Sequence, residues 1–276
     1  MNLNNKIKSQ RKSKKQPTWV KVSIAILLFV IVVIVVTVCA ELSGIIILRK
    51  TEDMVGSENA ISVLWVGNSD VFVGELPGQL KNVARPHDVE IVYKDISRHS
   101  NRGGGISGLK ESAINEMQSG RFDYIVLMDD PWQTRDNTGE FLSDVRLLCE
   151  EARMHGTIPV LFNAMWAATG NRPDEARLST TIEAYKQAAN ENDTILVNAA
   201  DAWIYAYQTI PEVALINRFD PRGPHPSKAG GFYTACLFAA KLFDLQIEDI
   251  PKDSRYKGND AIDLAKAAWE FVQLSR

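Results

Sequence analysis

Two residues far apart along the chain, a serine and a histidine, have neighbours that suit nucleophilic catalysis. Ser69 lies in Gly67-Asn68-Ser69-Asp70, directly after a short apolar run. A serine at the start of a helix, with backbone N–H groups nearby, suits attack on a carbonyl group and stabilisation of the oxyanion that forms. The simpler interpretation is structural, since Asn, Ser and Asp after a strand also favour turns and helix N-caps.

A serine nucleophile needs a base, and the chain contains four histidines. His225 is the best placed, because it lies in the loop Asp220-Pro221-Arg222-Gly223-Pro224-His225-Pro226-Ser227, directly before an apolar helix. The prolines and the glycine predict a rigid loop rather than a packed core position. Asp220 is near enough in sequence to orient the imidazole. A structural histidine is the alternative interpretation.

Carboxylate and aromatic side chains are expected near the same site. Asp129 and Asp130 follow a buried strand, and we interpret them as capping groups rather than metal ligands, because no histidine cluster accompanies them. No metal and no organic cofactor is therefore expected. Several aromatic side chains also lie in or beside the neighbouring loops: Trp132, Trp166, Trp203, Tyr205 and Tyr207. The simpler interpretation is that they pack into the core, and the alternative is that they stack on sugar rings.

The elements that must position these residues alternate between strand and helix. Five short apolar runs have the length of buried strands, at residues 61–67, 89–97, 122–130, 157–165 and 194–201. Stretches with helical spacing separate the runs, and two further helices follow the fifth. This order predicts one α/β domain over residues 61–276, with about five parallel strands covered by helices on both faces. Active sites of such sheets lie at the carboxyl ends of the strands.

The N-terminal residues predict a membrane anchor. Residues 22–40 carry no charge and are long enough for one transmembrane helix. Residues 1–21 are basic and contain no acid, so we expect this tail in the cytoplasm, residues 41–60 as a stalk, and the domain outside the cell membrane. A cleaved signal peptide is the alternative, since Val38-Cys39-Ala40 is similar to a cleavage site.

Composition limits the class of protein. The 276 residues carry a formal net charge of −3, with 45% hydrophobic and 24% charged residues, which excludes a disordered chain. Residues 1–21 carry seven positive charges and no negative one, so the rest of the chain carries a net charge of −10, which predicts no nucleic-acid partner. Cys149 and Cys236 fall in apolar helical patterns and are expected to be buried hydrophobic residues, while Cys39 lies in the membrane segment.

Taken together, these segments resemble the SGNH (GDSL-type) hydrolase family over about residues 61–243. The segment VLWVGNSDVFVGELPGQL is similar to the family's first block, and DPRGPHPSKAGGFYTACLFA to its last. The segments FDYIVLMDDPWQT and PVLFNAMWA resemble the third-strand and fourth-strand blocks. The resemblance implies a three-layer flavodoxin-like fold, here preceded by one transmembrane helix.

The resemblance also implies roles for individual residues in a serine ester hydrolase. Ser69 would be the nucleophile, His225 the base and Asp220 the residue that orients it. Residues of the oxyanion hole or of substrate binding would be Asn68, Gly104, Gly105, Asp130 and Trp166. The expected substrate is an acylated small molecule or a cell-surface or extracellular glycan, with hydrolysis or transfer of the acyl group.

Two departures from the family pattern leave a second function open. The family's acid lies three residues before the histidine, where this chain has Arg222. The oxyanion-binding Asn or Gln of the third block has no clear match, and Asp129 or Asp130 occupies its neighbourhood. The alternative is therefore a catalytically weak or inactive SGNH-like module that binds envelope glycan or a protein partner.

Overall fold

The computed structural model describes residues 56–99, 104–120, 122–164, 167–169, 172–217, 224–250, 252 and 254–276. The predicted basic tail, the membrane segment 22–40 and most of the stalk lie outside these residues. Within the described ranges, no helix combines the length and the apolar character needed to cross a bilayer.

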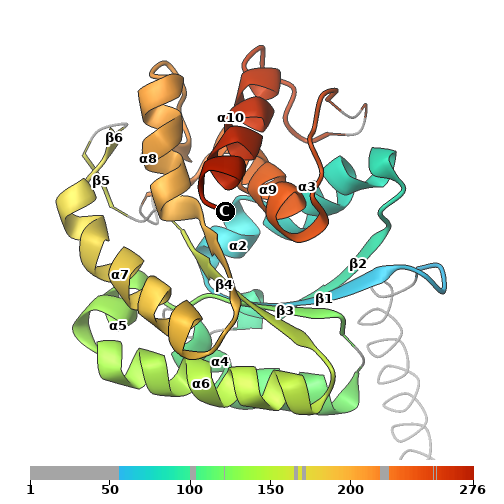
Figure 1. The fold of residues 1–276 in the computed structure, drawn as a ribbon, viewed down its shortest axis with the longest axis vertical. Helices are drawn as coiled ribbons and strands as arrows, with labels where there is room; N and C mark the ends of the chain where they lie inside the picture. The colour runs from blue at the N-terminus through green and yellow to red at the C-terminus, as the bar shows by residue number, and fades with distance from the viewer. Residues whose placement is uncertain are drawn as a thin grey trace, which may run out of the picture. The chain divides into compact units, whose positions relative to one another are not determined.

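A five-stranded parallel sheet lies at the centre of the domain (Figure 1). The strands follow the order β2-β1-β3-β4-β7, with bounds β1 (Ile61–Val66), β2 (Ile91–Asp95), β3 (Tyr124–Leu127), β4 (Ile158–Asn163) and β7 (Ile195–Asn198). Val66 pairs with Leu127, so the loops after β1 and β3 leave the sheet side by side. Because β1 lies between β2 and β3, the strand order reverses here, which is where open α/β sheets bind ligands.

Successive side chains of each central strand enter two different cores. Val63 and Trp65 of β1 are buried in one core, and Leu64 and Val66 in the other. A strand buried on both faces needs apolar residues at consecutive positions, which explains the continuous apolar runs in the sequence.

Helices cover both faces of the sheet (Figure 1). One face packs against α3 (Leu76–Ala84), α8 (Ala199–Thr209), α9 (Lys228–Phe243) and α10 (Ala261–Leu274), and the other against α4 (Ile106–Ser119), α6 (Thr138–Met154) and α7 (Glu175–Glu191). Short helical segments follow the strands or connect them: α2 (Ser69–Val73), η3 (Arg85–His87), η4 (Ser97–His99) and α5 (Pro131–Asp136). The predicted α/β class and the five parallel strands are confirmed.

Some predicted boundaries are wrong. The apolar run 194–201 is not one strand, because β7 ends at Asn198, whose side-chain oxygen accepts a hydrogen bond from the Asp201 N–H at 3.2 Å and caps α8. Two antiparallel pairs of two-residue strands were also not predicted, namely β5 (Ala168–Thr169) with β6 (Arg172–Pro173) and β8 (Ile216–Asn217) with β9 (His225–Pro226). Strands of two residues are too short to show a hydrophobic period.

The two described cysteines behave as the sequence predicts. Cys149 in α6 and Cys236 in α9 are buried and form no disulfide. Burial raises the pKa of the Cys149 thiol to about 11. Both side chains therefore pack as small hydrophobic groups.

Candidate active site

Ser69 is the first residue of α2, immediately beyond the carboxyl end of β1. Asn68 precedes it as the N-cap, and its side-chain oxygen accepts a hydrogen bond from the Asp70 N–H at 2.9 Å. The backbone carbonyl of Asn68 accepts a further bond from the Val71 N–H at 3.2 Å. The structural interpretation of this motif is thus correct for Asn68, and the same cap holds Ser69 at the rim of the sheet.

His225 lies at the same rim, although it belongs to the C-terminal part of the domain. Its Nε2 lies 2.9 Å from the Oγ of Ser69, although 156 positions separate the two residues in sequence. His225 is largely buried, with 8% of the residue exposed. A hydroxyl within hydrogen-bond distance of a buried imidazole is the arrangement in which histidine takes a proton from a serine nucleophile.

The histidine is held by a short hairpin and by the start of α9. Asn217 pairs with His225 in the β8–β9 hairpin. Two residues later, Ser227 caps α9: its Oγ accepts a bond from the Gly230 N–H at 3.1 Å and donates one to the Ala214 carbonyl at 2.6 Å. These bonds fix the backbone on both sides of the imidazole.

Glycines allow α2 and α9 to approach closely enough for the pair to meet. A Cβ at Gly231 would overlap the carbonyl oxygen of Gly74, the residue that ends α2, and one at Gly74 would press on Pro226. Gln79 in α3 reinforces this contact, because its Nε2 donates to the Gly74 carbonyl at 2.8 Å and to the Lys228 carbonyl at 3.3 Å. Gly231, six residues after His225, is the sequence signal for this close packing.

The glycine-rich loop after β2 fits tightly between the loop that follows β1 and the loop that follows β3. Gly104 and Gly105 have φ values of +71° and +89°, which favour glycine. A Cβ at Gly104 would lie 3.0 Å from the Asn68 Cα, and one at Gly105 would overlap the Asp129 carboxylate. The Gly105 N–H donates to the Gly67 carbonyl at 2.9 Å. This bond occupies the amide that we expected to bind an oxyanion, so the expectation is wrong for Gly105; Gly104 is compatible with it.

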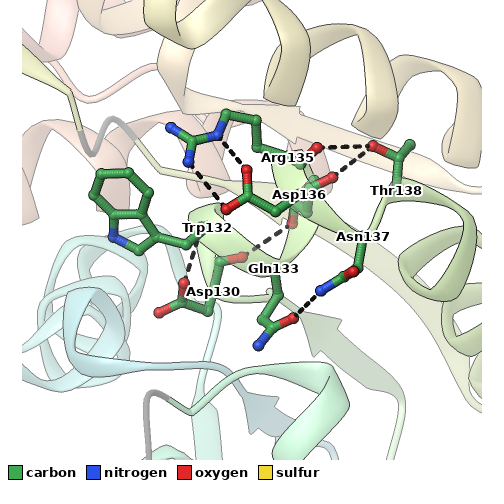
Figure 2. A network of polar contacts seen from close by, with 8 residues as sticks. Asp130, Trp132, Gln133, Arg135, Asp136, Asn137 and Thr138 are labelled. Atoms are coloured by element: carbon green, nitrogen blue, oxygen red, sulfur yellow. Dashed lines mark hydrogen bonds and ion pairs between the residues drawn. The ribbon is translucent and has the colours of Figure 1, made fainter.

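The two carboxylates after β3 cap helices. The Oδ1 of Asp129 accepts bonds from the Ser107 N–H at 3.3 Å and the Ser107 hydroxyl at 3.2 Å, at the start of α4. Asp130 is the N-cap of α5, and its Oδ1 accepts a bond from the Trp132 N–H at 2.9 Å (Figure 2). These caps confirm the interpretation of both residues as capping groups. Burial raises the pKa of Asp129 to about 6, although the bonds from Asp130 and Ser107 favour its charged form.

Asp70 is a buried carboxyl that the sequence analysis left without a role. Only 7% of the residue is exposed. Burial, together with the nearby charge of Asp130, raises the pKa of the Asp70 carboxyl to about 7. Within the described part of the chain, its carboxyl accepts no hydrogen bond. A neutral Asp70 is therefore close in free energy to a charged one near neutral pH.

Two predicted site residues, Asp220 and Trp166, lie outside the described residues, as does Arg222. The structure brings together Asn68, Ser69 and His225, with Gly104, Gly105 and Asp130 beside them. It thus unites the predicted nucleophile and base at the carboxyl edge of the sheet.

Comparison with known proteins identifies the fold. No protein-family model matches the chain, and no curated protein matches it by sequence. A DUF4886 family protein from Bacteroides uniformis has a TM-score of 0.59 at 15% identity, over 78% of this chain and 96% of its own. The acetyl xylan esterase AlAXEase has a TM-score of 0.51 at 16% identity, over 67% and 98% of the two chains.

A third solved structure is an acetylxylan esterase from Geobacillus stearothermophilus, determined as a catalytic mutant. Its TM-score is 0.50 at 21% identity, over 68% of this chain and 95% of its own. The chain therefore shares the fold of these esterases. At these identities the likeness concerns the fold, so an activity must be argued from the site itself.

Proposed function

We propose that this chain is a serine ester hydrolase of SGNH type. The observation that carries the proposal is the distance of 2.9 Å between Ser69 Oγ and His225 Nε2. The tight backbone contacts around both residues hold this geometry, as preorganised catalysis requires. The fold supports the proposal, because both residues lie where open α/β sheets bind ligands.

The reaction would proceed through an acyl-enzyme. The Ser69 oxygen attacks the ester carbonyl carbon while its proton passes to His225 Nε2. The backbone N–H groups of Ser69 and Gly104 stabilise the oxyanion, and His225 then donates its proton to the leaving alcohol oxygen. Water attacks the acyl-enzyme with its proton taken by His225, and Ser69 leaves as the hydroxyl. Asp220 orients the imidazole through its other nitrogen.

An acylated glycan at the cell surface is the substrate class we propose, with transfer to another hydroxyl as a variant of the same chemistry. The predicted anchor at residues 22–40 supports it, because an anchored domain outside the membrane meets surface polysaccharide. Two of the structures with this fold are named acetyl xylan esterases, which adds support by analogy. Asn68, Asp130 and Trp166 would line the substrate site.

The activity is tested with the full chain in detergent and p-nitrophenyl acetate as substrate. Ser69→Ala should abolish hydrolysis, whereas Ser119→Ala, an exposed serine at the end of α4, should leave it intact. A fluorophosphonate should label the parent chain and not Ser69→Ala. Equal rates for Ser69→Ala and the parent would reject the assignment.

The second candidate is a non-catalytic module that binds glycan or a protein partner. The occupied Gly105 amide and the carboxylates at the third-strand block favour it, because both weaken an oxyanion hole. Failure of the fluorophosphonate to label Ser69 in a folded chain would select this alternative.

Membrane anchoring is tested separately. The full chain should stay in the membrane pellet after extraction with alkaline carbonate, and N-terminal sequencing should find residues 1–21 still attached. Release of the chain into the supernatant, or an N-terminus near residue 40, would favour the cleaved signal peptide.

A further inference from the structure

A polar pocket of about 300 Å³ lies against α2, the helix that begins at Ser69. Its walls come from α2, from α3, from the end of β2 and from the segment before α10. The lining side chains that carry a ring or a charge are Phe72, Glu75, Tyr93, Asp95, Arg98 and Arg255. Because β2 ends at Asp95 and Arg98 follows in η4, the pocket lies toward the carboxyl ends of the strands, as Ser69 does.

Close contacts place Arg98 next to the turn that carries the nucleophile. The residue before it, Ser97, lies against Gly67, since a Cβ at Gly67 would lie 3.5 Å from the Ser97 hydroxyl oxygen. Phe72 follows Ser69 by three positions in α2, so the two side chains are neighbours on the helix surface, about 4.5 Å apart along its axis. The guanidinium carbon of Arg98 lies 5.2 Å from the centre of the Phe72 ring. A substrate with its ester carbonyl at Ser69 can therefore extend over Phe72 to this guanidinium.

The guanidinium of Arg98 is oriented by its neighbours, but its hydrogen-bond donors are not used by them. Its Nε lies 3.6 Å from Asp95 Oδ2, which is within ion-pair range but beyond hydrogen-bond distance. Asp95 is engaged elsewhere, because its Oδ1 accepts a bond from the Ser97 N–H at 2.9 Å. To the residues that the structure describes, the Arg98 guanidinium donates no hydrogen bond, and 63% of its side chain is exposed. A charged group with five N–H donors in a planar fork is thus available to a ligand.

The second arginine of the pocket is already paired. Arg255 Nη1 lies 2.8 Å from Glu75 Oε2, so these two charges compensate each other directly. Arg98 is compensated only by the more distant Asp95. An anionic group that enters the pocket therefore meets Arg98 as its main partner, and Glu75 is the acid that opposes it.

We propose that this pocket is a subsite for the carboxylate of an acidic sugar in the acylated glycan, with Arg98 as the residue that binds it. A guanidinium matches a carboxylate through two parallel N–H···O bonds. One available guanidinium beside the acids Asp95 and Glu75 suits a singly charged carboxylate better than a doubly charged phosphate group. The subsite rests on the proposed function for its reacting serine, but carboxylate binding at Arg98 does not require that Ser69 be reactive.

The first experiment measures binding without turnover, with the full chain in detergent and Ser69→Ala as the background. Calorimetric titration with trigalacturonate should give a Kd that Arg98→Gln weakens about tenfold. The trimethyl ester of trigalacturonate lacks the charges, so Arg98→Gln should change its Kd far less. Arg146→Gln is the matched control, since Arg146 is an exposed residue of α6, on the opposite face of the sheet. An unchanged Kd for trigalacturonate in Arg98→Gln, or no binding of trigalacturonate, would overturn the subsite.

A second variant should act in the opposite direction. Glu75→Gln removes the opposing carboxylate and leaves Arg255 charged, so trigalacturonate should bind about threefold tighter. Damage to the fold would weaken binding, so a gain separates the electrostatic role from a structural one. Unchanged or weaker binding in Glu75→Gln would contradict the proposal. Displacement of trigalacturonate by an equal concentration of inorganic phosphate would assign the pocket to a phosphate group and overturn the carboxylate.

The final experiment connects the pocket to turnover. The ratio of kcat/KM on acetylated oligogalacturonide to kcat/KM on acetylated xylo-oligosaccharide should fall about tenfold in Arg98→Gln and stay at the parent value in Arg146→Gln. Arg98-dependent binding of trigalacturonate without Ser69-dependent hydrolysis would retain the subsite and reject the esterase. Ser69-dependent hydrolysis of p-nitrophenyl acetate with no effect of Arg98 on binding or on this ratio would retain the esterase and reject the subsite.

Discussion

The imidazole Nε2 of His225 lies 2.9 Å from the hydroxyl oxygen of Ser69, at the edge of the sheet where β1 ends. The contact joins the first and the last of the sequence segments that resemble the SGNH hydrolase family. It depends on glycines at Gly74 and Gly231, where a side chain would separate α2 from α9. The candidate catalytic pair is thus a product of helix packing rather than of local sequence.

Removing either member of this pair should abolish esterase activity. Ser69→Ala and His225→Ala should each lower kcat by about 10⁴-fold or more, and the double variant should be little worse than either single one, because the two groups act as a unit. Hydrolysis of p-nitrophenyl acetate provides the measurement. Additive losses in the double variant would contradict a shared role.

The orienting acid can be tested by moving it. Asp220→Asn should lower kcat by up to about 10⁴-fold, because the imidazole would lose its charged partner. Adding Arg222→Asp to that variant places a carboxylate three residues before His225 and should recover part of the loss. Asp249→Asn, at an exposed position, controls for charge removal. Parent-like activity in Asp220→Asn would exclude Asp220 from this role.

The buried carboxyl of Asp70 should make stability depend on pH. Its pKa is raised to about 7 in the folded chain, above the ordinary value of 3.8, so the folded state binds more protons between these limits. The free energy of unfolding should therefore fall as pH rises from about 4 to 7, by up to about 4 kcal/mol, and level off above pH 7.

Asp70→Asn should remove most of that slope and be more stable than the parent at pH 8. A residual slope is expected, because burial also raises the pKa of Asp129 to about 6. Denaturant unfolding at several pH values checks this, with Asp249→Asn as the control. An unchanged slope in Asp70→Asn would show that Asp70 ionises normally.

The glycine loop can be probed by adding one methyl group. Gly105→Ala should destabilise the fold by several kcal/mol, about 1–2 from the positive φ and about 1–3 from overlap with Asp129. Gly156→Ala is the matched control: it has φ +72° with nothing within 4 Å of its Cβ, so it should cost only the backbone strain. Equal losses of stability in Gly105→Ala and Gly156→Ala would show that the loop shifts to accommodate the added methyl group.

The helix caps show which parts of the site could be predicted. Carboxylates after a strand commonly bind exposed N–H groups, which predicts that Asp129 and Asp130 are capping groups, and the bonds from Ser107 and Trp132 agree. The hydrogen bond that the Gly105 N–H donates to the Gly67 carbonyl, which occupies this amide, could not be predicted. That bond depends on how two loops from different strands pack, which no local pattern encodes.

By itself, the sequence determined the five buried strands, their alternation with helices, and Ser69 and His225 as candidates, because burial period and turn chemistry are local properties of the chain. Tertiary structure alone decided that these two side chains meet, that Asp70 is buried, and that Trp132 is exposed whereas Trp203 is not. Those outcomes depend on which surfaces pack together after segments up to 156 residues apart have assembled, and a residue type does not specify its distant neighbours.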